Sequence, residues 1–422
     1  MHILLIHQAF TTMKDPGGTR HYELARHLAD RGLRVTVLAG QVSYLTGQRG
    51  DRKGWLIQEE AENGLEILRC YSLPGWHRSF AARALSFISF SASSFLIGLR
   101  ISRVDLVWGT SPPILQGATA LVLARLKRAK FLFEVRDLWP MFAVAVGVLK
   151  NPVLIWASEW LERFLYRNAD GVVVNSPGFI EHVKSRGAAG VELVSNGADV
   201  GMFNPKETGS RYRRAHGLEG RFVALYAGAH GMSNDLQVVL QAASRLARYD
   251  GIVFVLVGDG KEKPALLGRA EQLGLQNLKF LPPVSKSEMP QVLAAADACI
   301  AILKPLDVYK TTYPNKVFDY MAAGKPVILA IDGVIRKVVE DAGAGLFSPP
   351  GDPETLAQAV LELAFDRRRG EALGKAGRIY VEAHFDRPSM VDKMEQAMLA
   401  VSSGRPGAGG REPPDPTGGP SG

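Results

Sequence analysis

Short runs of β-branched and aromatic residues alternate with segments of helical periodicity in the first half of this chain, and the alternation restarts in the second half. Such a pattern predicts parallel sheets covered by helices. The strands expected in the first half are Ile3–Ile6, Val35–Leu38, Leu65–Cys70, Leu106–Trp108, Phe131–Glu134, Val172–Asn175 and Val191–Ser195. The strands expected in the second half are Phe222–Tyr226, Ile252–Val257, Leu278–Leu281, Ala298–Ala301 and Val327–Ala330. The expected helices include Thr19–Arg31, Asn234–Tyr249, Lys261–Leu273, Ser287–Ala295, Asn315–Ala323 and Pro353–Phe365. The predicted fold class is α/β, with two Rossmann-like domains facing across a cleft.

A turn-rich segment separates the two halves and predicts the domain boundary. Residues 195–205 contain Asn-Gly and Asn-Pro pairs, which favour turns and suit a hinge. The predicted domains are residues 1–196 and 197–382, and a helix over about 383–401 is expected to return to the first domain. Residues 403–422 are rich in Pro and Gly and can bury little apolar area, so we expect a disordered tail.

Charge and cysteine content narrow the class of protein. The 422 residues carry a formal net charge of +8, which suits anionic partners such as phosphorylated small molecules or acidic lipid headgroups. No stripe of Lys and Arg with interleaved aromatic residues is present, so nucleic acid is disfavoured as a partner. Cys70 and Cys299 are the only cysteines and fall in different predicted domains, which argues against a disulfide framework. The N-terminal sequence predicts a strand instead of a signal peptide, so we expect a cytoplasmic protein.

Residues 80–103 form an apolar, serine-rich segment with arginines on both flanks. The segment approaches the ~20 apolar residues of a membrane span, but its serines dilute it. Three structures remain open: a helix buried in the N-terminal domain, a helix lying in a membrane interface, and a true span. The flanking arginines favour the interface over a simple core helix.

Two segments of the first predicted domain could carry chemistry. Gly17 and Gly18 open a predicted helix, where backbone N–H groups and the positive helix end could meet a phosphate; a purely steric glycine turn is the alternative. Glu134, Arg136 and Asp137 cluster at the C-terminal end of a predicted strand, where open α/β sheets place their ligands. The alternative is an ion pair of Arg136 with Asp137 or Glu134 that braces the loop.

Two segments of the second predicted domain suggest a site for a nucleoside diphosphate. Gly228 would admit a phosphate close to the backbone, and His230 could donate to it. A helix beginning at Asn315 would present its N–H groups and Lys316 to a pyrophosphate at its positive end. Asp319, one turn further on the same face as Lys316, could hydrogen-bond the vicinal hydroxyls of a ribose. The alternatives are a structural histidine and a surface Lys–Asp pair on an amphipathic helix.

These segments together resemble a known family. PNKVFDYMAAGKPVI, at residues 314–328, resembles the helix signature of the retaining family-4 glycosyltransferases, which have the GT-B fold. PGGTRHYELARHLADRGLRVTVLAG, VSNGADVGMFNP and VGDGKEKPALLGRAEQLGLQNLKFLPPV are similar to the family's opening glycine loop, its hinge and its nucleotide-domain strand, helix and base-contacting loop. FEVRDLWP and SPGF further resemble the subgroup that acts in O-antigen and capsule assembly, which includes N-acetylfucosamine transferases.

The resemblance implies a reaction. The chain would move an N-acetylated amino or 6-deoxyamino hexose from a UDP-sugar to a polyprenyl-diphosphate-linked acceptor, which it would meet at the membrane surface through residues 80–103. Gly17 and Gly18 would help to bind the donor, and Gly228, His230 and Lys316 would stabilise the departing diphosphate. The expected catalytic residues are Glu134, Arg136 and Asp137, of which Arg136 or Asp137 would orient the acceptor hydroxyl or receive its proton. No acidic D-x-D pair occurs in the chain, so no metal cofactor is expected.

The chain departs from the family pattern in two places. The family has two glutamates eight positions apart: Asp319 replaces the second, which contacts the ribose, and Thr311 replaces the first, which contacts the donor sugar. Where the family often has an Arg and a Lys for the pyrophosphate, this chain has His230, Asn234 and Asp235. Lys316 is therefore the candidate cation.

The missing carboxylate at Thr311 motivates a second hypothesis. Under this hypothesis the chain is a non-catalytic nucleotide-binding partner in a membrane polysaccharide assembly. A third hypothesis, a GT-B epimerase acting on a UDP-N-acetylhexosamine, is disfavoured because the chain offers too few acidic and His candidates for an elimination. The two hypotheses that remain differ in one observable, the transfer of sugar.

Overall fold

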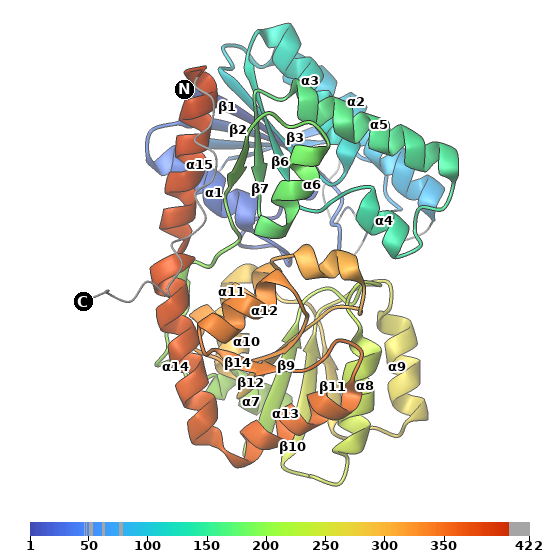
Figure 1. Ribbon diagram of the computed structural model, residues 1–422, viewed down its shortest axis with the longest axis vertical. Coiled ribbons are helices and arrows are strands. Elements are labelled where there is room, and N and C mark those ends of the chain that lie inside the picture. The colour runs from blue at the N-terminus through green and yellow to red at the C-terminus, as the bar shows by residue number, and fades with distance from the viewer. Residues whose placement is uncertain (46, 48, 50–53, 61–63, 76–78, 405–422) are drawn as a thin grey trace, which may run out of the picture.

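The computed structural model describes residues 1–404 apart from 46, 48, 50–53, 61–63 and 76–78, so the predicted tail beyond Gly404 lies outside the described residues. Two α/β units follow one another along the chain, each built around one sheet with helices on both faces (Figure 1). This arrangement confirms the predicted α/β class with two Rossmann-like sheets.

The first sheet contains eight strands in the order β3-β4-β2-β1-β5-β6-β7-β8. Its strands are β1 (His2–His7), β2 (Arg34–Gly40), β3 (Leu56–Glu60), β4 (Leu65–Cys70), β5 (Leu106–Ser111), β6 (Lys130–Val135), β7 (Gly171–Val174) and β8 (Val191–Leu193). All neighbouring pairs are parallel except β3 with β4. Each strand predicted for this half is present. The edge strand β3 was not predicted, because its sequence LIQEE lacks a run of β-branched residues.

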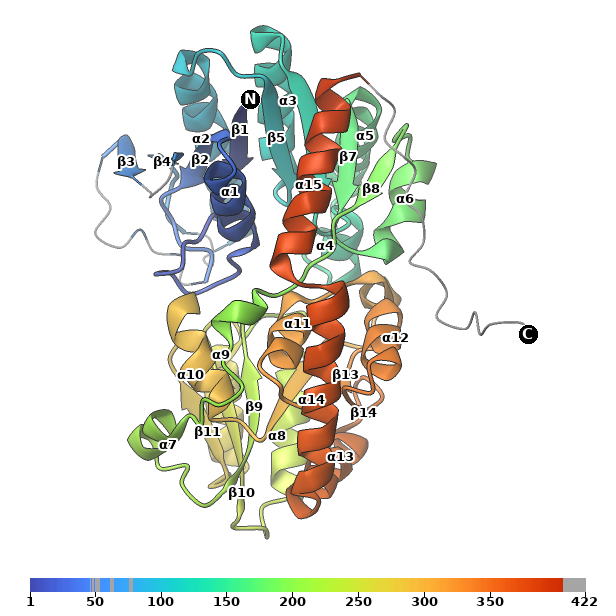
Figure 2. The same cartoon turned by 90° about the vertical axis from the view of Figure 1, so that its left-hand side faces the viewer.

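Helices cover both faces of this sheet. They are α1 (Arg20–Asp30), α2 (Phe80–Arg100), α3 (Ile114–Lys127), α4 (Met141–Ala145), α5 (Pro152–Asn168), the 3-10 turn η1 (Pro177–Phe179) and α6 (Ile180–Ser185). One core cluster lies beneath α2, α3 and α5, and the other lies beneath α1. The C-terminal helix α15 (Arg387–Ser402) joins this second cluster and packs against α1, β6 and β7 (Figure 2).

The second sheet contains six parallel strands in the order β11-β10-β9-β12-β13-β14. They are β9 (Phe222–Ala227), β10 (Ile252–Val257), β11 (Leu278–Leu281), β12 (Ala298–Ile302), β13 (Val327–Ala330) and β14 (Gly345–Phe347). The predicted strands are all present. The edge strand β14 was not predicted, because three residues beginning with glycine give no periodic signal.

Two groups of helices cover the second sheet. The elements of this half are η2 (Val200–Met202), α7 (Ser210–His216), α8 (Leu236–Arg245), α9 (Lys263–Gln272), η3 (Lys286–Glu288), α10 (Met289–Ala294), η4 (Asp307–Thr311), α11 (Asn315–Ala322), α12 (Val334–Asp341), α13 (Pro353–Phe365) and α14 (Arg367–His384). The core on one face contains residues of α8, α9 and α13. The core on the other face contains residues of α10, α11, α12 and α14.

The apolar segment at residues 80–103 forms helix α2, which packs on α3, β2 and β4. Its buried side carries serines: Ser93 donates to the Tyr71 carbonyl at 2.6 Å, and Ser86 and Ser94 are fully buried. Its exposed side carries large apolar residues, including Leu85 and Ile88, which are more than half exposed. The helix has the length and composition of a membrane span, but its packing on the sheet is that of a surface helix with an apolar outer face.

Candidate active site

The carboxyl-terminal ends of both sheets meet at the junction of the two domains. Hydrogen bonds across this junction include Ser176 Oγ to the Thr311 carbonyl (2.5 Å), Asn196 Nδ2 to the Tyr313 carbonyl (2.6 Å) and the Ser287 N–H to the Met13 carbonyl (3.2 Å). The rings of Phe142 and Tyr309 also meet edge to face, with centroids 5.7 Å apart. Open α/β sheets place ligands beyond the carboxyl ends of their strands, so the junction is the expected position for a site.

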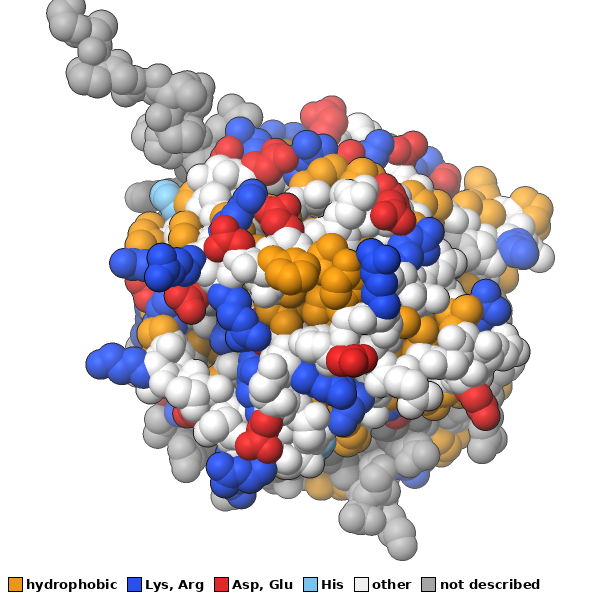
Figure 3. Space-filling model, turned by 90° about the horizontal axis from the view of Figure 1, so that it is seen from below, with side chains coloured by type: hydrophobic (Ala, Val, Ile, Leu, Met, Phe, Trp, Pro, Cys, Tyr) orange, Lys and Arg blue, Asp and Glu red, His pale blue; other side chains and the backbone are white. Residues whose placement is uncertain are grey.

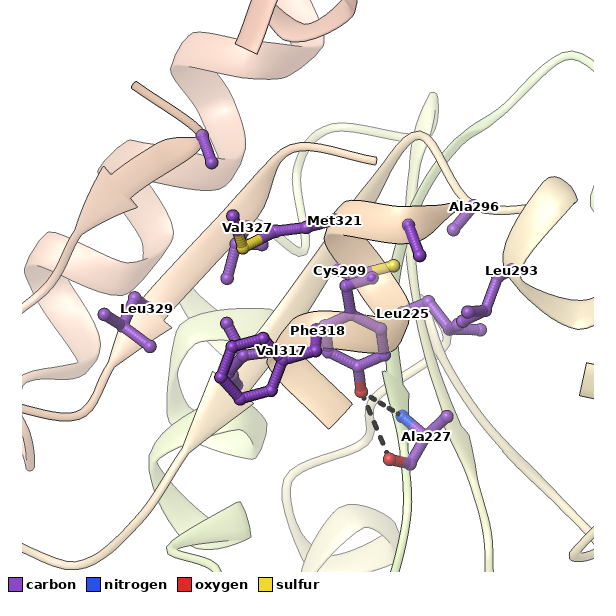
Figure 4. Packing of buried hydrophobic residues seen from close by; sticks show 14 of the residues in the cluster. Leu225, Ala227, Leu293, Ala296, Cys299, Val317, Phe318, Met321, Val327 and Leu329 are labelled. Carbon is purple, nitrogen blue, oxygen red and sulfur yellow. Dashed lines mark hydrogen bonds between the residues drawn. The ribbon is translucent and has the colours of Figure 1, made fainter. Parts of the chain in front are cut away.

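Helix α11 is held firmly against the end of β9. The Tyr320 hydroxyl accepts from the Ala227 N–H at 3.0 Å and donates to the Ala227 carbonyl at 3.1 Å (Figure 4). On the same helix Phe318 and Met321 are fully buried in the core (Figure 4). This packing places the N-terminal turn of α11 beside the glycine turn that follows β9.

Lys316 and Gly228 meet at this point. A Cβ built on Gly228 would lie 2.7 Å from Lys316 Nζ, and the backbone of Gly228 has φ +149°, so a side chain here would be both crowded and strained. Lys316 Nζ lies 3.9 Å from the ring centroid of Tyr226 and has no hydrogen-bond partner among the described residues. Burial lowers the pKa of Lys316 to about 7. A buried cation without a partner is costly, and an anionic ligand would supply the missing partner.

His230 lies in the same turn, and its ring nitrogens likewise have no hydrogen-bond partner among the described residues. The ring sits between Tyr226 and Phe280, with centroids 6.1 and 6.0 Å away. Its backbone N–H donates to the Asp259 carbonyl at 2.8 Å, which fixes the turn. Burial, and then the charge of Lys263, lowers the pKa of His230 to about 4. A neutral imidazole of this kind can donate one N–H to a phosphate oxygen.

Asp319 lies one turn along α11, but it does not pair with Lys316. Its Oδ2 accepts from Lys286 Nζ at 2.7 Å and from Asn315 Nδ2 at 3.3 Å. Asp319 Oδ1 and Asn315 Oδ1 are buried and have no hydrogen-bond partner among the described residues. The alternative of a surface Lys–Asp pair is therefore excluded, and one carboxylate oxygen remains open to a ligand hydroxyl.

The carboxylate of Glu134 is occupied by hydrogen-bond donors of its own domain. It is fully buried and accepts from Arg20 Nε (3.0 Å), from the His21 ring (2.8 Å) and from Trp108 Nε1 (2.9 Å). Burial would raise its pKa, but His21 and Arg20 hold it well below its ordinary value. Both of its oxygens accept from side chains of α1 and β5, so Glu134 has the contacts of a residue that braces the first domain instead of those expected of a catalytic carboxylate.

Arg136 and Asp137 lie where β6 ends at the junction. Arg136 Nη2 donates to the Pro112 carbonyl at 3.1 Å, its Nε has no hydrogen-bond partner among the described residues, and no ion pair within 4.0 Å joins it to Asp137 there. Asp137 is exposed as a whole residue, but its carboxyl group lies among protein atoms, and this desolvation raises its pKa to about 6 against the opposing effect of Arg136. A carboxyl group that titrates near neutrality suits a general base.

Gly17 and Gly18 form a loop closed by Tyr44. The Gly18 N–H donates to the Tyr44 hydroxyl at 3.3 Å, and Gly17 has φ +139°, with Tyr44 Cε1 only 2.9 Å from a built Cβ. Burial raises the pKa of Tyr44 and the charge of Arg136 opposes that effect, while burial and then Tyr44 raise the pKa of Tyr226 in the second domain. The loop therefore lies at the junction, with Tyr44 between the glycines and the second domain.

Thr311 occupies the position where the resemblance places a carboxylate. Its hydroxyl donates to the Val308 carbonyl at 2.7 Å within η4, and its carbonyl accepts from Ser176. A Cβ built on Gly178 would lie 2.5 Å from the Thr311 carbonyl oxygen, so the first domain packs directly on this residue. Thr311 has the contacts of a domain-interface residue.

Sequence reasoning missed two side chains at the junction, Tyr44 and Lys286. Each is distant in sequence from the group that it contacts, and neither belongs to a glycine turn or a charge cluster. The only local signal is that Lys286 follows a predicted strand of the second sheet.

Comparison with known proteins assigns the two domains. Residues 17–197 match the family described as "Glycosyl transferase 4-like domain", and residues 221–366 match the family described as "Glycosyl transferases group 1". WcaI of Escherichia coli strain K12, named as a glycosyl transferase of colanic acid biosynthesis, is 24% identical over 321 residues, which cover 74% of this chain and 78% of WcaI.

Solved structures share the fold over nearly the whole chain. Sucrose-phosphate synthase of Thermosynechococcus elongatus is similar with a TM-score of 0.73 and 20% identity, over 95% of this chain and 99% of that one. Anabaena HepE in complex with UDP-glucose is similar with a TM-score of 0.68 and 16% identity, over 96% of this chain and 100% of that one. The chain therefore belongs to the group 1 and family-4-like glycosyltransferases, and its two domains have the GT-B fold.

Proposed function

We propose that this glycosyltransferase retains anomeric configuration and moves an N-acetylated amino or 6-deoxyamino hexose from a UDP-sugar to a polyprenyl-diphosphate-linked acceptor in cell-surface polysaccharide synthesis. The observation that carries the donor site is a pair of buried groups beside Gly228, Lys316 Nζ and the His230 ring, for which the described part of the chain offers no hydrogen-bond partner. The UDP-glucose bound to HepE supports a UDP-sugar donor, and the name of WcaI supports a role in polysaccharide synthesis.

The proposed chemistry follows from where charge develops. When the anomeric C–O bond breaks, the bonding electrons leave with the diphosphate of UDP, and the acceptor oxygen forms the new bond to the anomeric carbon on the face that the diphosphate leaves. The Lys316 ammonium, the His230 N–H and the backbone at Gly228 lie together to receive that negative charge. Asp137, with a pKa of about 6, would accept the proton of the acceptor hydroxyl, and Arg136 would orient that hydroxyl. The proposal includes no resident metal ion.

The test is a transfer assay on the purified full chain. UDP-sugars are first screened by thermal unfolding, because a ligand that binds only the folded state raises its stability. A stabilising UDP-sugar is then incubated with a polyprenyl-diphosphate-linked sugar, and mass spectrometry follows the product while NMR reports its anomeric configuration. Binding of UDP without transfer to any acceptor would contradict the proposal and favour the non-catalytic nucleotide-binding partner.

We also propose that the outer face of α2, α3 and α5 rests on a membrane. These helices lie side by side on one flank of the first domain (Figure 1). Their large apolar side chains exposed to solvent are Leu85, Ile88, Leu96, Leu99, Val122, Leu126, Val153, Leu154, Trp156, Trp160 and Phe164. Exposed arginines lie on or just beyond the same helices: Arg100, Arg125, Arg128 and Arg167. Apolar and aromatic side chains bordered by arginines suit an interface that contains anionic lipid.

The opposite end of the molecule has a different surface. Seen from below in Figure 3, the end of the second domain shows a central hydrophobic patch, and acidic and basic side chains mix around it. The carboxylates there offset the attraction of the basic side chains for anionic headgroups. A cytoplasmic protein that meets a lipid-linked acceptor would therefore present its first domain to the membrane.

Replacing Trp156 and Trp160 with Glu should weaken binding to vesicles that contain anionic phospholipid by at least roughly tenfold, because two interfacial anchors are lost and negative charge is added. Trp156 is 66% exposed and Trp160 is 54% exposed, so the fold should be preserved. Co-sedimentation with vesicles measures the change. The matched control is Phe365→Glu, since Phe365 is 76% exposed on the second domain. If the Trp variant and the wild type bind the vesicles equally well, the outer face of α2, α3 and α5 is not the membrane-binding face.

A further inference from the structure

Four buried charged groups form a cluster where the two domains meet. Lys286 Nζ donates to Asp319 Oδ2 at 2.7 Å within the second domain. Glu23 of α1 accepts from Arg387 Nε of α15 at 2.6 Å. The two pairs act on each other, because Lys286 lowers the pKa of Glu23 and Glu23 raises the pKa of Asp319. Lys286 therefore pairs with the carboxylate of α11, and its charge also lowers the pKa of the carboxylate of α1 in the other domain.

The contact with Lys286 gives a hydrogen-bond partner to only one of the two carboxylate oxygens of Asp319. Oδ2 is occupied, while Oδ1 is buried and has no hydrogen-bond partner among the described residues. Burial favours the protonated form of Asp319, and the cation of Lys286 opposes that effect. The pKa of Asp319 stays above its ordinary value, so the contact with Lys286 is what favours its ionised form, and the carboxylate then has one fixed oxygen and one open oxygen that can accept from a ligand hydroxyl.

We propose that Lys286 is a positioning residue for the donor nucleotide: it keeps Asp319 ionised and turned so that the open oxygen Oδ1 faces the ribose hydroxyls. This inference rests on the proposed function, which places a UDP-sugar at α11. Lys286 itself touches no sugar. It acts through Asp319, and its charge also connects the ribose position with the Glu23–Arg387 pair of the first domain.

A purely structural role for Lys286 predicts a different result. Lys286 Nζ lies 5.5 Å from the centre of the Phe203 ring, so the side chain contributes packing as well as charge. Loss of packing would weaken all nucleotides equally. Loss of the positioning role would weaken the binding only of a nucleotide whose ribose hydroxyl donates a hydrogen bond to Asp319. Comparing UDP with 2′-deoxy-UDP separates the two cases.

The experiment measures the dissociation constants of UDP and 2′-deoxy-UDP by calorimetry on the full chain. The wild type should prefer UDP by roughly tenfold or more, the value of a hydrogen bond to a charged group. Lys286→Met keeps the length of the side chain and removes its charge, and the preference should fall toward one. Lys286→Arg should restore it. Lys325→Met is the matched control, because Lys325 is also an interior lysine of this domain, but it donates to the Ala294 and Ala296 carbonyls.

The outcomes separate this inference from the donor site itself. Asp319→Asn should remove the preference for UDP; if it does so while Lys286→Met keeps the wild-type preference, the role of Lys286 is overturned and the donor site stands. If neither variant changes the preference, the ribose does not lie at Asp319, and both proposals fall. Thermal unfolding confirms that each variant is folded, and Lys286→Gln replaces the Met variant if that one does not fold.

Discussion

Replacing Lys316 with Met and Asp319 with Asn in the same chain should reduce UDP-sugar turnover by at least roughly 10³-fold, because one preorganised donor alone is worth about 10²–10³ in rate. The first substitution removes the cation beside Gly228, where a Cβ would lie 2.7 Å from Lys316 Nζ. The second removes the charge of the carboxylate with the open oxygen. Single-turnover kinetics with saturating acceptor measures the loss, and thermal unfolding reports whether the variant is folded.

The matched control makes the same two chemical changes on the solvent-facing side of another helix. Lys337 and Asp341 form an i,i+4 pair on α12, with Nζ and Oδ2 3.5 Å apart. The variant Lys337→Met with Asp341→Asn should keep the wild-type rate, because exposed pairs contribute little. Wild-type turnover by the α11 variant would show that the diphosphate and the ribose bind elsewhere.

Replacing Arg387 with Met should lower the free energy of unfolding by about 3–5 kcal/mol, since Glu23 is then left buried without its cation. Arg387 is fully buried, and it donates to Glu23 and to the Gly197 carbonyl, both at 2.6 Å. Urea unfolding followed by fluorescence measures the change. Adding Glu23→Gln should recover part of the loss, because no unpaired charge then remains.

A second arginine supplies the control for this pair. Arg31 also joins α1 to α15, through Asp392 and Glu395, each at 2.6 Å, but it is exposed. Arg31→Met should cost under about 1 kcal/mol. If both variants lose the same free energy of unfolding, burial is not the reason that the Arg387–Glu23 pair stabilises the fold.

The pH dependence of the Glu23 pair has a definite sign. Burial would raise the pKa of Glu23, but Arg387 and then Lys286 lower it from 4.5 to about 2. The stabilisation is therefore complete above pH 4.5 and is lost as the pH falls toward 2.

The sequence predicted every interior strand, because each is rich in apolar residues, and it also predicted the edge strands β8 and β11. It missed the other two edge strands, β3 with the sequence LIQEE and β14 with only three residues. It placed α11 correctly because that helix begins directly after Pro314, in the motif that resembles the helix signature of the family-4 glycosyltransferases. It could not give α2 its orientation, since hydropathy does not reveal that the serines face the protein and the leucines face water.

The role of a charged residue depends on neighbours that are distant in sequence. Glu134 was expected to be catalytic or to form an ion pair with Arg136, but its donors come from α1 and β5. Lys286 and Asp319 are 33 positions apart, and no periodic pattern joins them. Only tertiary contacts decide which carboxylate is occupied and which is open.

The chain crosses between its two halves twice, once near Ala198 and again near Phe385, where the Ala198 N–H donates to the Phe385 carbonyl at 3.1 Å. The last helix then fills a face of the first sheet with Met390, Met394 and Met398. The first domain is therefore not a contiguous stretch of sequence. A polypeptide that stops at residue 384 would expose this apolar face of the first sheet to water. Separate expression of the amino-terminal half would therefore require the final helix to be added as a second polypeptide or joined through a linker.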